Sequence, residues 1–180
     1  MSIKLPKDRI ITPKELLNYA IFYNEQADVA DLATNMGFKL TLNKFLKQDI
    51  RCAILSGLDC DSNMKKDDII KIIAIDNFQS REWIRFEVAY LIALYVLRGN
   101  DVDFAVRVTY SDFFKEENLE VVNYASELLL TDNLIRERLL YVDGYWDFEK
   151  LKSEVMVPDF ILRRKIGKIK EERKWLYMKI

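Results

Sequence analysis

The sequence has no histidine among its 180 residues. Histidine is the usual general base of serine and cysteine hydrolases, and it is the commonest side chain that binds zinc. Ser-His-Asp and Cys-His catalytic arrangements are therefore excluded, together with every zinc site that needs an imidazole nitrogen. Two phosphate-binding motifs are absent as well, because the chain contains neither a G-x-G-x-x-G run nor a P-loop sequence.

Long hydrophobic runs are also lacking. The apolar stretch at residues 88–97 is only about half as long as a membrane-spanning helix, which needs about 20 residues. Residues 1–9 contain no apolar core of the kind found in secretory signals. These features predict a protein that makes no membrane contact and is located in the cytoplasm.

Cysteine is scarce, and neither sign of charge dominates the chain. Cys52 and Cys60 are expected to be free thiols in a reducing compartment, since a metal site built on this pair would lack partner ligands at a recognisable spacing. The formal net charge of −1 indicates no particular partner. With 50% apolar and 32% charged residues and no flexible linker, residues 1–180 are expected to form a single globular domain.

The hydrophobic pattern predicts an α+β fold in which helices predominate, with a small antiparallel sheet. Thr12-Pro13-Lys14-Glu15 is typical of a helix start, and the apolar stripe that follows predicts a first helix. That stripe consists of Leu16, Leu17, Ala20, Ile21, Tyr23 and Ala27. Residues 28–33 either continue this helix or form a second one, and Gly37 ends the region.

Two aliphatic runs, residues 51–58 and 69–75, predict neighbouring antiparallel strands, and residues 38–42 are a candidate third strand. A short helix or turn is expected at residues 111–115. Helices are expected at residues 80–97, 117–130, 132–141 and 159–178, and a short helix is expected at residues 147–155.

The predicted helix at residues 85–97 reads R-F-E-V-A-Y-L-I-A-L-Y-V-L. It resembles the zinc-binding helix of the ImmA/IrrE metallopeptidase family, R-F-T-L-A-H-E-L-G-H-Y-L-L, in its initial Arg-Phe, its Ala and its Tyr-aliphatic-Leu ending. In that helix two histidines four residues apart bind zinc, and the glutamate after the first histidine is the general base. The two histidine positions hold Tyr90 and Leu94 here, and the glutamate position holds Leu91.

Two later blocks extend the resemblance to about residues 69–166. Residues 120–131, E-V-V-N-Y-A-S-E-L-L-L-T, are similar to the family's second helix, E-A-N-x-F-A-A-E-L-L-M-P, and Glu120 falls on its third zinc ligand. Residues 151–166 resemble a segment near the family's C-terminus. The resemblance implies a zincin-like fold with its core at 69–166, an N-terminal helix and first strands at 1–68, and a basic C-terminal helix at 167–180.

The resemblance also implies that the zinc chemistry has been lost. A catalytic zinc site needs three protein ligands and an open position for water, and only Glu120 remains. We therefore expect a pseudo-enzyme without catalytic residues, metal or cofactor, in which Tyr90, Leu91, Leu94 and Glu120 are vestigial positions. Leu91 and Leu94 are expected to be largely buried, and Tyr90 is a candidate hydrogen-bond donor to Glu120. An active metallopeptidase would need ligands outside the three matching blocks.

The C-terminal segment carries an excess of positive charge. From residue 163 to residue 180 there are eight basic and two acidic side chains. Candidate contacts to a nucleic-acid backbone or an acidic protein surface are Arg163, Arg164, Lys168 and Lys170. The alternative is a solvated terminal helix with an inward apolar side, formed by Ile161, Leu162, Ile166, Ile169 and Trp175.

ImmA/IrrE proteins commonly accompany phage or mobile-element regulators and act on helix-turn-helix repressors. The resemblance therefore implies a regulatory factor that binds a protein, either a helix-turn-helix repressor or a host-defence protein that it inhibits. The alternative function is a nucleic-acid-binding module that uses the basic C-terminal helix.

Overall fold

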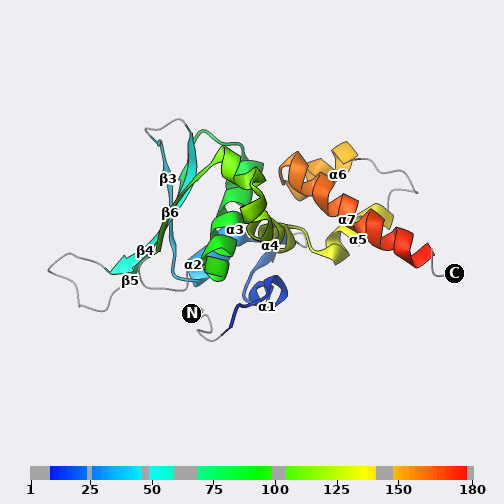
Figure 1. The fold of residues 1–180 in the computed structure, drawn as a ribbon, viewed down its shortest axis with the longest axis horizontal. Helices are drawn as coiled ribbons and strands as arrows, with labels where there is room; N and C mark the ends of the chain where they lie inside the picture. The colour runs from blue at the N-terminus through cyan, green and yellow to red at the C-terminus, as the bar shows by residue number, and fades with distance from the viewer. Residues whose placement is uncertain are drawn as a thin grey trace.

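The computed structural model places a four-stranded sheet, a central pair of helices and three C-terminal helices side by side (Figure 1). It describes residues 9–23, 26–45, 49–58, 69–98, 104–140 and 148–177. No helix within these ranges is both long and apolar enough to cross a membrane. The architecture is α+β, as the hydrophobic pattern predicted.

The larger sheet has the strand order β3-β5-β4-β6. Its strands are β3 (Lys39–Asn43), β4 (Ile50–Leu58), β5 (Ile69–Asp76) and β6 (Phe104–Thr109). The antiparallel pairing expected for residues 51–58 and 69–75 is confirmed. The candidate strand near residue 40 is also confirmed, but it runs parallel to β5, so the sheet is mixed and not purely antiparallel.

Strand β6 was not expected from the sequence. It pairs antiparallel with β4 at the edge of the sheet. Val108 faces the core, whereas Ala105 and Arg107 are exposed. This period-two alternation is a strand signal, although six residues give it little length.

The central helix α3 (Arg81–Arg98) covers one face of the sheet, and residues 86–96 are all buried. The helix contacts β4 and β5, and its other sides meet α2 (Val29–Asn35) and α4 (Leu119–Leu129). A helix that is apolar on nearly every side is stable only when it is surrounded in this way. On the opposite face of the sheet, Leu55 is 45% exposed.

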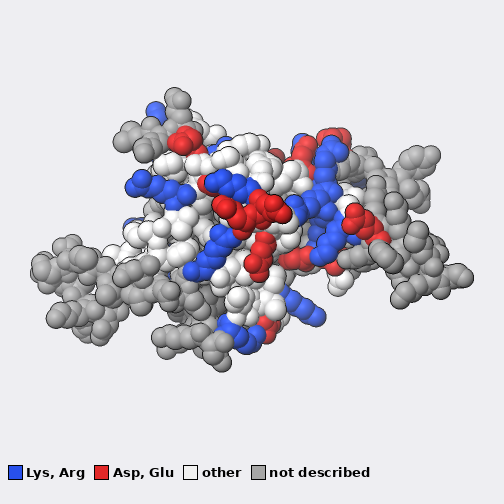
Figure 2. Space-filling model, viewed as in Figure 1, with Lys and Arg blue, Asp and Glu red and all other residues white. Residues whose placement is uncertain are grey.

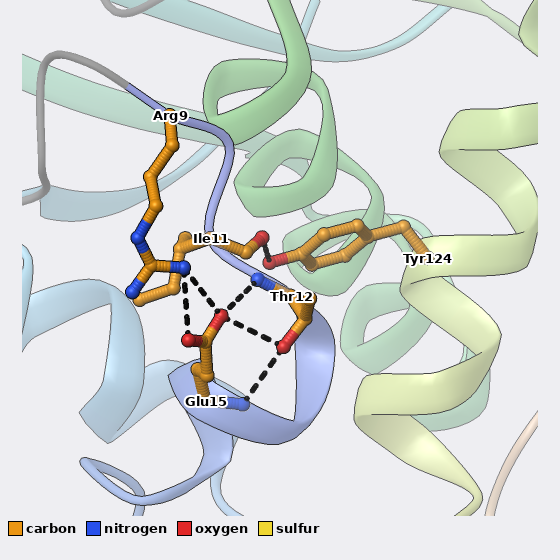
Figure 3. A network of polar contacts seen from close by, with 5 residues as sticks. All are labelled: Arg9, Ile11, Thr12, Glu15 and Tyr124. Atoms are coloured by element: carbon orange, nitrogen blue, oxygen red, sulfur yellow. Dashed lines mark hydrogen bonds and ion pairs between the residues drawn. The ribbon is translucent and has the colours of Figure 1, made fainter.

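The first helix is much shorter than expected. Helix α1 covers only Pro13–Leu17, where Thr12 and Glu15 form a capping box (Figure 3). The predicted extension to Ala27 is wrong, because β1 (Phe22–Tyr23) and β2 (Gln26–Ala27) form a small antiparallel hairpin. Aromatic and β-branched side chains favour extended backbone, and a short helix without packing partners is marginal in water.

Helix α2 settles the alternative left open for residues 28–33. It is a separate helix, because the Asp28 carboxylate accepts hydrogen bonds from the backbone nitrogens of Ala30 and Asp31 and so starts a new helical segment. Gly37 follows with a φ of 86°, a left-handed conformation that glycine adopts without strain. It ends the region as expected.

The C-terminal helices are α5 (Asp132–Leu140), α6 (Phe148–Val155) and α7 (Asp159–Tyr177). Arg85 of α3 joins the end of α6 to the N-terminal hairpin: its Nη1 donates to the Val155 carbonyl at 2.7 Å and to Gln26 Oε1 at 2.6 Å. The expected inward side of the last helix is confirmed for Ile161, Leu162, Ile166 and Ile169, which are buried, while the Trp175 side chain lies outside the described residues.

Candidate functional site: an aromatic surface, a buried ion pair and a charged groove

The positions of α3 that the resemblance aligns with the zinc-binding helix lie in the core. Tyr90, Leu91 and Leu94 are all buried, as expected for the two leucines. The Tyr90 ring packs edge-on against Phe113, with centroids 4.9 Å apart, and Phe113 comes from the 3-10 helix η1 (Tyr110–Phe114). Burial raises the pKa of the Tyr90 hydroxyl, which therefore stays protonated. Tyr90 therefore packs among aromatic rings in the core.

Glu120 lies elsewhere. It is exposed in the first turn of α4, and no hydrogen bond joins it to Tyr90 in the described structure, so the expected contact is wrong. One turn later, the Tyr124 hydroxyl donates to the Ile11 carbonyl at 2.8 Å and ties α4 to the segment before α1 (Figure 3). Among the described residues, no three acidic or cysteine side chains converge as a metal site.

A buried ion pair connects the sheet to α3. Glu87 is 0% exposed, and its Oε1 accepts a hydrogen bond from Arg51 Nε at 2.9 Å. Arg51 is the extra residue of a β-bulge: Ile50 and Cys52 of β4 face consecutive residues of β6, Thr109 and Val108. Such a bulge redirects a side chain, and here it accounts for the contact between Arg51 and the helix.

Burial raises the pKa of Glu87 to about 7, although the charge and hydrogen bond of Arg51 act in the opposite direction. The second carboxylate oxygen of Glu87 and the Nη2 of Arg51 are buried without a hydrogen-bond partner in the described structure. Burial also raises the pKa of the neighbouring Cys52 thiol, so this cysteine is a poor nucleophile. The hydrogen-bonding capacity of the Arg51–Glu87 pair is therefore only partly satisfied inside the core.

An aromatic surface covers this ion pair. It consists of Trp83 of α3, Tyr110 and Phe114 of η1, and Phe160 of α7. The Trp83 ring stacks on the Phe160 ring, with centroids 5.6 Å apart. The centroid of the Phe114 ring lies 5.1 Å from that of Phe160 and 5.2 Å from that of Tyr110. The Arg51 guanidinium lies 4.8 Å from the Trp83 ring and 5.6 Å from the Tyr110 ring. Despite this packing, Tyr110 and Phe114 remain 50% and 54% exposed.

The basic residues of α7 are partly neutralised within the chain. Lys165 is only 3% exposed, and its Nζ lies 2.7 Å from Glu127 Oε1 and 2.6 Å from Asp132 Oδ1. Lys168 lies 3.5 Å from the same Glu127 oxygen. Arg163 and Arg164 are exposed, whereas the Lys170 side chain lies outside the described residues. The last helix is therefore less strongly cationic than its sequence indicates.

A groove of about 570 Å³ separates α4 from α7. Its charged lining mixes both signs: Glu120, Glu127 and Glu171 with Arg164, Lys165 and Lys168. Figure 2 shows this mixture on the surface, where basic side chains form a column over the first half of α7 and acidic side chains lie beside it over α3 and α4. Glu120, the position aligned with a zinc ligand, and Arg164 of the basic C-terminal segment thus line the same groove.

The sequence did not single out the ion pair or the aromatic surface, although one signal was present. Trp83, Glu87 and Tyr90 are spaced by four and three residues, which places a carboxylate on the aromatic face of a buried helix. No sequence signal identified the bulge at Arg51. Comparison with known proteins finds no matching family model, no similar curated protein and no similar solved structure.

Proposed function

We propose that this chain is a non-catalytic factor that binds another protein through the aromatic surface. The observation that carries the proposal is the half-exposure of Tyr110 and Phe114, whose rings are held in place by Trp83 and Phe160. Rigid aromatic side chains supply a large apolar contact area at low entropic cost and are enriched in interface hot spots. Adjacent exposed rings are typical of a docking surface.

The proposed absence of catalysis rests on chemistry. Tyr90, Leu91 and Leu94 are buried and offer neither a metal ligand set nor a general base. Glu120, the one family ligand that the resemblance retains, faces a different groove. A pseudo-enzyme of ImmA/IrrE type accounts for a helix that keeps the family's frame without its reactive side chains.

The resemblance also directs the choice of partner. ImmA/IrrE proteins act on helix-turn-helix repressors, so we propose a regulatory role in a phage or mobile element, with a repressor or a host-defence protein as the partner. The aromatic surface fits a partner that presents aliphatic or aromatic side chains. Nucleic-acid binding by α7 is the less favoured function, because Lys165 and Lys168 already have carboxylate partners.

The test uses affinity capture from a nuclease-treated lysate of the native host. The unmodified chain is compared with a Tyr110→Ala/Phe114→Ala variant and with Leu55→Ser, which changes an exposed apolar residue on the uncovered face of the sheet. We expect one protein to be retained by the unmodified chain and by Leu55→Ser, and lost from the double variant. Binding is then measured with that protein purified.

Three outcomes would contradict the proposal. Equal capture by all three chains would exclude the aromatic surface, and loss only from Leu55→Ser would place the contact on the sheet. Tight binding of DNA or RNA that weakens steeply with salt would favour the basic helix instead.

A further inference from the structure

The groove between α4 and α7 is built from two helix faces. Glu120, Asn123 and Glu127 follow one another at helical spacing along α4, and Arg164, Lys168 and Glu171 do so along α7. Long side chains bridge the two helices: Arg164 Nε donates to Asn123 Oδ1 at 3.0 Å. A pocket of about 570 Å³ is within the usual range for small-molecule sites.

Opposite charges remain available in this groove. Glu127 forms ion pairs with Lys165 and Lys168, whereas Glu120 makes no hydrogen bond or ion pair with any described residue. Arg164 uses only its Nε on Asn123, so the two terminal nitrogens have no partner within the described ranges. Glu120 lies one helical turn before Asn123 on α4, and the side chains of Glu120 and Arg164 both line the groove.

Gly167 is a second, independent feature of the groove wall. Glycine in a helix interior is destabilising relative to alanine, because its backbone loses more conformational freedom on folding. A Cβ placed on Gly167 would meet nothing within 4 Å, so close packing does not require glycine at this position. Gly167 lines the groove, and its missing side chain leaves space beside the backbone of α7.

We propose that the groove binds a small zwitterion of the free amino-acid class, with its carboxylate on Arg164 and its ammonium group on Glu120. A guanidinium fork pairs with a carboxylate through two parallel hydrogen bonds. A simple anion would meet Glu120 and Glu171, and a simple cation would meet Arg164 and Lys168, so each is opposed by a like charge. A zwitterion avoids both penalties.

The experiment is an NMR titration of the ¹⁵N-labelled full chain with pools of free L-amino acids, followed by the single members. We expect amide shifts at Asn123, Gly167 and Lys168, which line the groove. The best amino acid is then compared with its N-acetyl and carboxamide derivatives, each of which lacks one charge. Each derivative should bind at least about tenfold more weakly, because one charge-assisted contact is lost.

Two variants test which residue binds the carboxylate of the ligand and which binds its ammonium group. Arg164→Gln and Glu120→Gln should each weaken binding of the intact amino acid by at least about tenfold. Arg107→Gln on β6 and Glu116→Gln in the 3-10 helix η2 (Glu116–Asn118) are matched exposed controls and should bind normally. The Tyr110→Ala/Phe114→Ala chain should also bind the amino acid normally. Failure of amino-acid binding can therefore be distinguished from failure of the proposed protein contact.

The inference is overturned if no pool shifts the groove amides at about 10 mM, a very weak affinity for a specific site. It is also overturned if an N-acetyl or carboxamide derivative binds as tightly as the parent amino acid. Unchanged affinity in Arg164→Gln or in Glu120→Gln would contradict the assigned orientation and the proposal with it.

Discussion

The buried Glu87 carboxyl should make the protein less stable at pH 8 than at pH 5. Its pKa is raised by burial from 4.5 to about 7, with Asp76 adding to the rise and Arg51 opposing it. Between these values the folded chain keeps a proton that the unfolded chain has lost. The resulting stabilisation is fully present below about pH 4.5 and is lost as the pH rises through about 7.

The size of the effect follows from the difference between the two pKa values. At about 1.36 kcal/mol per pH unit, a rise from 4.5 to about 7 corresponds to about 3 kcal/mol in the free energy of unfolding. Between pH 5 and pH 8 the expected loss is about 2–3 kcal/mol. Glu87→Gln resembles the protonated carboxyl, so it should remove this loss and be more stable than the unmodified chain at pH 8.

The measurement is urea unfolding at pH 5, 6, 7 and 8 for the unmodified chain, Glu87→Gln and the exposed control Glu116→Gln. The difference between the unmodified chain and Glu87→Gln isolates the Glu87 contribution, because all other titrating groups are common to both. A difference that stays within about 0.5 kcal/mol across this range, or that grows in the opposite direction, would refute the reasoning. The control should follow the unmodified chain at every pH.

Three further predictions concern helix α3, the metal content and the basic helix α7. Leu94→Ala should lower the free energy of unfolding by about 2–5 kcal/mol in denaturant unfolding, because it removes a buried side chain, and a change below about 0.5 kcal/mol would contradict that burial. Elemental analysis of the purified chain should find no stoichiometric zinc, and a chelator should leave its melting temperature unchanged; about one zinc per chain would exclude the pseudo-enzyme proposal. Reversal of Arg163, Arg164, Lys168 and Lys170 to Glu should leave capture of the protein partner intact, whereas its loss would move the contact to α7.

The sequence predicted best those elements whose signal is local and long. Helix α3 was expected because an uninterrupted apolar run with a polar start can only be a buried helix or strand, and its length favours the helix. The first helix was overextended, because a 3.6-residue stripe can be traced through residues that form a turn and a hairpin. The parallel pairing of β3 with β5 was not predictable in the same way. The partner and direction of a strand depend on tertiary contacts, which a local hydrophobic pattern does not encode.

The functional groups were less predictable for the same physical reason. Glu120 and Arg164 each stood out in the sequence, but their common groove depends on how α4 and α7 pack, and the contact that bridges these helices joins residues 41 positions apart. The Arg51–Glu87 pair depends on a single extra residue in β4. Without that bulge, simple alternation would place Arg51 on the opposite side of the sheet from Cys52, which faces α3.

Stability alone does not account for the Arg51–Glu87 pair. Removing two charges from water costs more than their attraction returns unless every polar atom is satisfied, and here one oxygen and one nitrogen are not. Apolar residues of similar volume would fill the site at lower cost. They would, however, leave no cation against the Trp83 and Tyr110 rings, which the guanidinium approaches at 4.8 and 5.6 Å. Beyond connecting β4 to α3, the pair places a cation against the Trp83 ring and the Tyr110 ring, and Tyr110 is half exposed at the surface proposed for the partner.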